Sequence, residues 1–288
     1  MRILVVGDGM WDRYTFGKNT RMSPEDSSVP ILDVHSVDYR FGGAFNVACN
    51  LKSIYPTAMV TVCSPMSDYT ANKLKEKNIT TIGSFPVQLY APSQDEIIKH
   101  RVLNIENGKQ IIRIDNRKTF DRDCILDFQT RLKNSKLNYD IVVVSDYNKG
   151  FVDYRVVDVL REFDGPVFID SKKPDLDFWK DITNCFIKIN WLEYTSAEHS
   201  NRVRNLVVTR SDQPVQLRHF NQLERQFDVE PVDNPDIVGA GDVFLAGMVV
   251  NYWQTKDISK AIRFAIKASA KSVLKQGTCE VFEDEICE

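Results

Sequence analysis

The stretch 233–250 joins a glycine-rich turn to a single acidic residue placed just before an apolar run. After the chain-breaking pair Asn234-Pro235 comes Gly239-Ala240-Gly241-Asp242, and apolar residues then extend to Val250. A glycine turn that leads into a helix leaves backbone N–H groups unpaired, and these groups and the helix dipole together attract phosphate. A carboxylate beside phosphate is repulsive unless it acts, for example by accepting a proton from an attacking hydroxyl. Asp242 as an ordinary N-cap fits the same four residues, so the motif alone leaves both interpretations open.

A second glycine motif precedes another predicted helix. Gly42-Gly43 permits a close approach of the backbone to another group, and the residues at 44, 47, 48 and 51 are small or apolar, which is one helical face. Asn46 falls in the first turn of this helix, where its amide can reach a ligand near the glycines. An asparagine that is simply exposed on a first turn is the alternative.

The elements that must position these residues alternate between strands and helices. Buried strands are predicted at 2–6, 59–63, 140–145, 166–170, 185–189 and 205–209, with helices at 68–77, 120–132, 152–163, after Gly239 and at 258–274, and a hairpin at 216–228. Polar residues follow most of these strands. In open α/β sheets ligands bind outside the carboxyl ends of the strands. This places Asp8 next to a ligand, although an ordinary Asp-Gly turn residue also fits the pattern.

Two segments interrupt the strand and helix alternation. Residues 31–37 show much apolar and polar alternation, which is strand-like, and the segment before them, up to Pro30, is polar and poor in helix-forming residues. The strands at 97–103 and 110–115 flank Asn107-Gly108, which is a strong hairpin signal. We therefore expect inserted segments at about 11–40 and 85–116 to form a small sheet of about four strands.

The length suits one large α/β domain spanning 1–288, or a domain with a small appendage. The chain is 43% hydrophobic and 27% charged, with a net charge of −3, so no basic excess indicates nucleic-acid binding. The first apolar run, Ile3 to Val6, is too short for a signal peptide, and no stretch has the length of a membrane span. The six cysteines form no Cys-x-x-Cys pair, which favours reduced thiols over zinc ligands. We expect a cytoplasmic protein.

Over about residues 3–278 these motifs resemble those of the ribokinase-type (PfkB) carbohydrate kinases, with the two glycine motifs carrying the broad resemblance. Asp12-Arg13-Tyr14, Ser23-Pro24-Glu25 and Ser145-Asp146-Tyr147-Asn148-Lys149-Gly150 are most similar to the kinase domain of bacterial D-glycero-β-D-manno-heptose-7-phosphate kinases. The resemblance implies a three-layer, doubly wound, mostly parallel α/β sheet with a small β-sheet lid. It also implies ATP-dependent phosphorylation of a sugar hydroxyl, here the anomeric C1 oxygen of a heptose 7-phosphate.

The resemblance also implies a role for each residue of the motifs. Asp242 would be the general base, and the backbone N–H groups of Gly239, Ala240 and Gly241 would form the anion hole. Residues that would bind the nucleotide or organise Mg²⁺ through water are Asn190, Glu193, Thr209, Arg210, Ser211 and Asp236. Residues that would bind the sugar are Asp8, Asp12, Gly42, Gly43 and Asn46, and those that would bind a phosphate already on it are Arg13, Lys99, Arg101 and Lys172. Solvated strand charges are the alternative for Lys99 and Arg101.

Further implications are a monovalent cation as an additional candidate cofactor and a homodimer formed through the lid. The chain departs from the family pattern at several positions. Val238 and Val243 stand where the family usually has Thr, Gln213-Pro214 and Ser64-Pro65 stand where it usually has Gly, and the helix after Glu193 is short. Two alternatives therefore stay open: a ribokinase-type kinase of another sugar or nucleoside, and a catalytically weak sensor of sugar phosphate or nucleotide.

Overall fold

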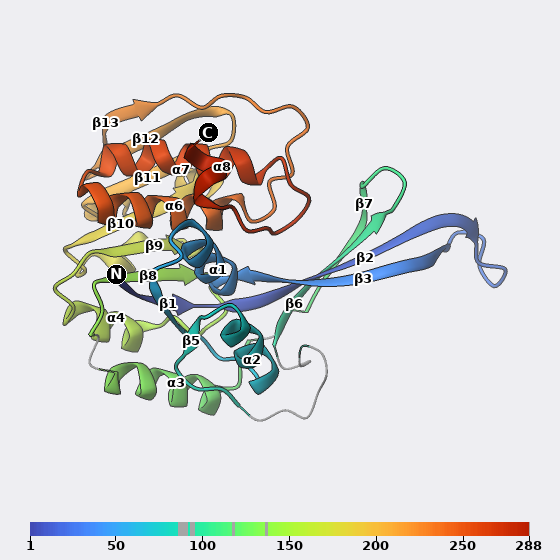
Figure 1. The fold of residues 1–288 in the computed structure, drawn as a ribbon, viewed down its shortest axis with the longest axis horizontal. Coiled ribbons are helices and arrows are strands. Elements are labelled where there is room, and N and C mark those ends of the chain that lie inside the picture. Colours follow the sequence, from blue (N-terminus) through green and yellow to red (C-terminus); the bar gives the residue numbers. More distant parts are fainter. Residues whose placement is uncertain (86–91, 93–95, 117–118, 136–137, 288) are drawn as a thin grey trace.

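The computed structural model describes residues 1–85, 92, 96–116, 119–135 and 138–287 and contains two β-sheets (Figure 1). Residues 86–91 and 93–95 of the predicted lid segment lie outside the described residues. The larger sheet has nine strands in the order β13-β12-β11-β10-β9-β8-β1-β4-β5, and the smaller has four in the order β3-β2-β6-β7. The predicted α/β architecture with a small second sheet is confirmed.

Seven neighbouring strands of the large sheet are parallel, and two antiparallel strands extend it at one edge. The parallel strands are β1 (Arg2–Gly7), β4 (Met59–Cys63), β5 (Thr80–Thr81), β8 (Ile141–Asp146), β9 (Val167–Ser171), β10 (Cys185–Asn190) and β11 (Asn205–Arg210). The antiparallel pair is β12 (Gln213–His219) and β13 (Gln222–Phe227). Strands such as β8 are buried along their whole length, because helices cover both faces, and this explains their continuous apolar sequence.

Helices form the two outer layers of the molecule (Figure 1). In β1, Ile3 and Val5 belong to one core and Leu4 and Val6 to the other, since successive side chains point to opposite faces. The first core includes residues of α1 (Ala44–Ile54), α2 (Asp68–Glu76), α6 (Ala240–Thr255), α7 (Ile258–Ser272) and α8 (Glu283–Cys287). The second includes residues of α3 (Arg122–Asn134), α4 (Tyr154–Arg161) and the short helix η1 (Leu176–Trp179). Two further short helices, α5 (Trp191–Ser196) and η2 (Ser200–Arg202), lie between β10 and β11.

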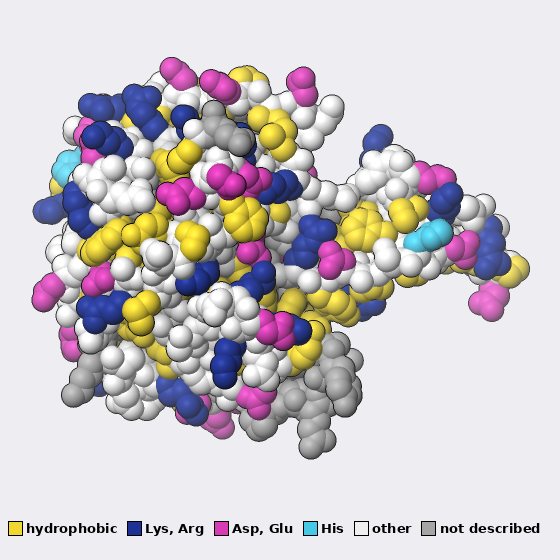
Figure 2. Space-filling model, in the orientation of Figure 1, with side chains coloured by type: hydrophobic (Ala, Val, Ile, Leu, Met, Phe, Trp, Pro, Cys, Tyr) yellow, Lys and Arg dark blue, Asp and Glu magenta, His cyan; other side chains and the backbone are white. Residues whose placement is uncertain are grey.

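The small sheet projects from the body as an arm (Figures 1 and 2). It consists of β2 (Gly9–Met22), β3 (Pro30–Gly43), β6 (Ile97–Asn104) and β7 (Gln110–Asp115). The hairpin predicted around Asn107-Gly108 is confirmed by the antiparallel pairing of β6 with β7. The polar stretch before residue 30, in which the sequence marked no individual strand, is occupied by β2 as far as Met22. The first half of β2 is buried at polar positions such as Asp12 and Thr15 as well as at apolar ones, so its sequence lacks the usual alternation.

Two sequence features bear on the environment of the protein. All six cysteines are free thiols, and burial raises the pKa of Cys49, Cys63 and Cys185, which keeps these thiols protonated and unreactive. Among the described residues, no helix combines the length and the apolar character needed to cross a bilayer.

Candidate active site

The start of α6 carries the predicted anion hole. Gly239 precedes the helix with φ 79°, a left-handed conformation that favours glycine, and no side chain caps the helix there. The N–H of Ala240 donates to the carbonyl of Ile237 at 3.3 Å, whereas the N–H groups of Gly239 and Gly241 have no hydrogen-bond acceptor among the described residues. Two free N–H groups at the positive end of a sixteen-residue helix form a site suited to an anion.

Asp242 lies in the first turn of α6 and is almost fully buried, with 2% of its surface exposed. Its Oδ2 accepts a hydrogen bond from Asn46 Nδ2 at 2.9 Å, and its Oδ1 accepts one from the Tyr147 hydroxyl at 3.0 Å. Burial raises the pKa of Asp242 to about 6, with the nearby Asp170 adding to the rise and the Asn46 hydrogen bond opposing it. A carboxylate with such a pKa is matched to accepting a proton near neutral pH.

Asn46 lies in the first turn of α1, as predicted, and its amide is directed at Asp242. Asn50, one turn later, donates to Asn46 Oδ1 at 3.1 Å and so fixes which way the amide points. An ideal Cβ on Gly239 would lie 2.9 Å from Asn46 Nδ2. The two glycine motifs, Gly42-Gly43 and Gly239-Ala240-Gly241, therefore lie close together beside Asp242, although they are about 200 residues apart in the sequence.

Asp8 follows β1 and is fully buried. Its Oδ2 accepts the backbone N–H groups of Tyr147 at 2.8 Å and Lys149 at 3.1 Å, which holds the loop after β8. Its Oδ1 is buried and has no partner among the described residues. Burial, and next the negative charge of Asp146, raise the pKa of Asp8 to about 7. A buried carboxylate with one free oxygen fits the predicted binding of a sugar hydroxyl.

The arm presents a cationic face beside these carboxylates. In the register of β2, β6 and β7, Lys99 is opposite Asp12, and Arg101 is opposite both Tyr14 and Arg113, so these side chains share one face of the sheet. Arg101 Nη2 lies 3.4 Å from Asp12 Oδ1. Burial lowers the pKa of Lys99, which the negative charge of Asp12 opposes. Arg113 was not among the predicted residues, because nothing in the sequence alone sets its register against Arg101.

Arg13 does not join this cationic face, so its predicted convergence with Lys99 and Arg101 is corrected. Neighbouring residues of a strand point to opposite faces, and Arg13 is therefore on the other side of the sheet from Asp12. Its guanidinium lies over the ring of Tyr39, 5.7 Å from the centroid.

Lys172 follows β9 and is not part of the arm, but its ammonium approaches the same Tyr147 ring as that of Lys99. It forms an ion pair with Glu193, and its ammonium is 5.6 Å from the centroid of the Tyr147 ring. Glu193 also completes a capping box at the start of α5, since its Oε2 accepts the N–H of Asn190 at 2.8 Å and its own N–H donates to Asn190 Oδ1 at 2.9 Å. Lys172 therefore belongs with the residues predicted to organise the metal.

The remaining predicted nucleotide residues lie along the same rim of the sheet. Thr209 pairs with Asn190 in the register of β10 and β11, and Arg210 stacks over the ring of Trp191 at 4.6 Å, with its Nε buried and unpartnered among the described residues. Ser211 follows with φ 57°. Asp236 serves the protein backbone, since it accepts the N–H groups of Val238 at 3.0 Å and Gly277 at 2.8 Å, so its carboxylate shapes the loop before the anion hole.

The sequence did not single out a buried ion pair under the anion hole. Lys188 Nζ lies 2.7 Å from Asp170 Oδ2, and both residues are at least 95% buried. An ideal Cβ on Gly241 would lie only 2.7 Å from Lys188 Nζ, so the ammonium is directly beside the predicted phosphate site. The signal was present in the sequence, because a lysine inside the apolar strand 185–189 needs a buried partner.

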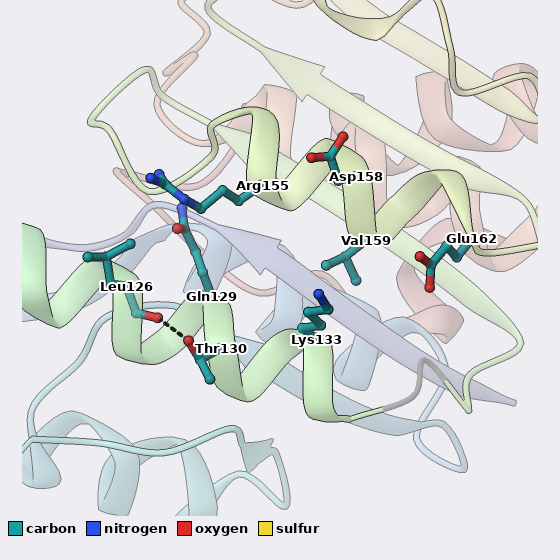
Figure 3. Close-up of a pocket in the computed structure, with 8 residues that line it drawn as sticks. All are labelled: Leu126, Gln129, Thr130, Lys133, Arg155, Asp158, Val159 and Glu162. Atoms are coloured by element: carbon teal, nitrogen blue, oxygen red, sulfur yellow. Dashed lines mark hydrogen bonds between the residues drawn. The ribbon is translucent and has the colours of Figure 1, made fainter.

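Two cavities lie outside this cluster. A groove of about 530 Å³ between α3 and α4 is lined by none of the predicted site residues (Figure 3). A second cavity, of about 470 Å³, lies at the base of the arm, and of the predicted site residues only Asn46 lines it. The candidate active site is therefore defined by its convergent side chains at the carboxyl ends of the parallel strands.

The fold is that of the ribokinase-like kinases. Over 99% of the chain it matches the ribokinase of Thermotoga maritima, covering 97% of that chain with a TM-score of 0.72 at 18% identity. It also matches phosphofructokinase-2 of Escherichia coli in complex with fructose-6-phosphate, with 99% and 97% of the two chains covered and a TM-score of 0.73 at 16% identity.

The sequence comparisons lead to the same family. Residues 187–285 match the model of the pfkB family carbohydrate kinases. The chain is 28% identical to the bifunctional protein HldE of Photobacterium profundum and 27% identical to that of Salmonella newport, in each case over 99% of its own length. It spans 63% and 62% of the length of these relatives. The predicted resemblance to the pfkB family carbohydrate kinases is thus confirmed.

Proposed function

We propose that the protein is an ATP-dependent sugar kinase in which Asp242 removes the proton from the attacking sugar hydroxyl. The observation that carries this proposal is the juxtaposition of a buried carboxylate, whose pKa is raised to about 6, with two free N–H groups at the start of the same helix. The carboxylate is suited to proton transfer, and the N–H groups of Gly239 and Gly241 to the charge on the transferring phosphoryl group. Ala240, bonded at 3.3 Å to Ile237, would contribute its N–H only after that bond opens.

The acceptor would be a sugar that already carries a phosphate, and we infer a heptose 7-phosphate phosphorylated at its anomeric oxygen. The free oxygen of Asp8 and the carboxylate of Asp12 suit sugar hydroxyls. Lys99 and Arg101 on one face of the arm suit a phosphate dianion, because converging cations offset its charge, and Arg113, which is paired with Asp115, lies beside them. The similarity to HldE over nearly the whole chain supports the same substrate class.

The nucleotide would lie along the rim formed by Thr209, Arg210 and Ser211. The buried Nε–H of Arg210 has no acceptor among the described residues and could donate to the nucleotide. Mg²⁺ prefers oxygen ligands and keeps most of its water, and when bound it would neutralise charge on the nucleotide phosphates. Asn190 and Glu193 would hold these waters, and the unpartnered buried Oδ1 of Asp170 offers a further carboxylate oxygen. A monovalent cation is a further candidate cofactor, to be tested by adding potassium to the assay.

We also propose that the arm mediates a homodimer. Its face opposite the cations exposes the apolar side chains of Val37, Ile112 and Ile114, and its edge strands are unpaired within the described chain. A second copy would cover this surface, and a monomeric mass by light scattering would contradict it. Free thiols and a nucleotide substrate are consistent with a cytoplasmic location.

The decisive experiment measures ADP release over phosphorylated and free heptoses, hexoses and pentoses. We expect turnover to be highest with a phosphorylated heptose, and Asp242→Asn to abolish turnover while the thermal melt remains that of a folded protein. Wild-type turnover in this variant would exclude the mechanism. A high rate with an unphosphorylated sugar or a nucleoside would exclude the heptose phosphate. Tight binding by calorimetry without any ADP release would instead favour a sensor.

A further inference from the structure

Tyr147 contacts the proposed base directly but has no role in the function described so far. It follows Asp146 in the loop after β8, and its hydroxyl donates to Asp242 Oδ1 at 3.0 Å, while Asn46 donates to Oδ2 at 2.9 Å. The carboxylate is therefore held by one donor on each oxygen. Of these two donors, only Tyr147 comes from a loop whose position depends on the predicted sugar ligand Asp8.

The ring of Tyr147 is fixed from several sides. Its backbone N–H donates to Asp8 Oδ2 at 2.8 Å, and an ideal Cβ on Gly43 would lie 3.3 Å from its Cε2, so the glycine leaves room for the ring. The ammonium of Lys99, on the arm, lies 4.3 Å from the ring centroid, which is a cation–π geometry. The phenol is thus aimed at Asp242 by Asp8, which follows β1, and by Gly43 and Lys99 of the arm strands β3 and β6.

We propose that Tyr147 is a positioning residue for the general base: its hydroxyl fixes Asp242 Oδ1 and stabilises the ionised carboxylate. The proposal rests on the proposed function of Asp242. A hydrogen bond donated to a carboxylate favours the charged form, and here it opposes the burial that favours the neutral form. Because Asp242 has a free lone pair remaining on each oxygen, the phenol orients the carboxylate without preventing it from accepting the proton of the sugar.

Tyr147 acts as a donor throughout the working pH range and does not exchange its proton. Burial, and next the negative charge of Asp242, raise the pKa of the phenol well above 10. The link to Lys99 also makes Tyr147 one contact between the arm and the base, since Lys99 lies on the cationic face that would bind the substrate phosphate.

The test is a ¹³C NMR titration of the Asp242 carboxyl in the ligand-free enzyme, comparing wild type with Tyr147→Phe. Phenylalanine keeps the ring and its packing but removes the donor, so the midpoint should rise by roughly one pH unit. Tyr139→Phe is the matched control, because its hydroxyl bonds Thr61 far from the site, and it should leave the titration unchanged. An unchanged Asp242 midpoint in Tyr147→Phe would overturn the proposal.

Kinetics supply a second readout. The acid limb of the kcat/KM profile should move to higher pH in Tyr147→Phe by the same amount as the NMR midpoint, and a profile that falls in height without moving would indicate a structural role only. If Tyr147→Phe fails to fold, the reciprocal titration of the Tyr147 ring carbon in Asp242→Asn decides, since the phenol midpoint should fall once the charge is gone. An unmoved phenol midpoint would refute the coupling. The NMR shifts need no turnover, so they stand or fall independently of the proposed kinase activity.

Discussion

Asp8→Asn should stabilise the protein increasingly as pH rises, although Asp8 is a predicted substrate ligand. Asp8 is fully buried, and its pKa rises from 3.8 to about 7 through burial and the neighbouring Asp146. An acid whose pKa is raised by folding is protonated in both states at low pH. Between about pH 4 and 7 the acid ionises in the unfolded state but stays protonated in the folded state, so the free energy of unfolding falls as pH rises.

The magnitude follows from about 1.36 kcal/mol for each pH unit between the unfolded and folded pKa. The loss is about 1.6 kcal/mol at pH 5 and about 4 kcal/mol at pH 8. Asparagine keeps one oxygen to accept the N–H groups of Tyr147 and Lys149, and it carries no charge. The free energy of unfolding of Asp8→Asn should therefore exceed that of wild type by about 2.5 kcal/mol more at pH 8 than at pH 5.

Urea unfolding at both pH values and equal protein concentration measures this difference. Asp177→Asn is a suitable control, because hydrogen bonds from Lys180 and Arg202 lower the pKa of this surface carboxyl to about 2. Its stabilising contribution is lost only as pH falls below 4, so its difference from wild type should be flat between pH 5 and 8. A flat difference for Asp8→Asn as well would show that Asp8 is not a strained buried acid, and would refute the reasoning.

Two further substitutions test the predicted anion hole and the buried ion pair beside it. Gly239→Ala places a Cβ at φ 79° and 2.9 Å from Asn46 Nδ2, so turnover by ADP release should fall by about a hundredfold, as when an anion-hole donor is lost; unchanged turnover would contradict a role for this turn. Lys188→Met leaves Asp170 buried without its partner and should cost about 3–5 kcal/mol in urea unfolding, with partial recovery when Asp170→Asn is added; full stability in the single variant would mean that the pair is dispensable.

The sequence predicts the large sheet well because its strands are buried on both faces. Short continuous apolar runs such as 141–144 fit few structures other than a buried strand. The Asn107-Gly108 turn specifies its hairpin through local sequence alone. By contrast, the extent of β2 within the inserted segment 11–40 could not be specified, because several polar residues of this strand are buried and its sequence lacks the alternation of an ordinary strand.

The sequence indicates individual candidate residues of the site, but it does not indicate which of them lie together in space. The positions of Asp242 and Asn46 at helix starts follow from the glycine motifs. The face on which Arg13 lies depends on which residue of β2 opposes Lys99, and that register is set by contacts distant in sequence. Tyr147 and Lys188 were missed for a related reason, since each has a function only through a partner distant in the sequence.

Val238 and Val243, which stand where the family usually has Thr, were the reason for considering a catalytically weak sensor. The surroundings of these two residues argue against that alternative. Val243 is fully buried in the core between α6 and the large sheet, so a hydroxyl at this position would face apolar side chains. Val238 is partly exposed, but its N–H is held by Asp236, which also binds Gly277. The loop is thus shaped by a carboxylate and by backbone groups. Because the proposed anion hole consists of N–H groups, which no side-chain replacement at 238 or 243 removes, the chemistry needs Asp242 and the glycines more than it needs the missing hydroxyls.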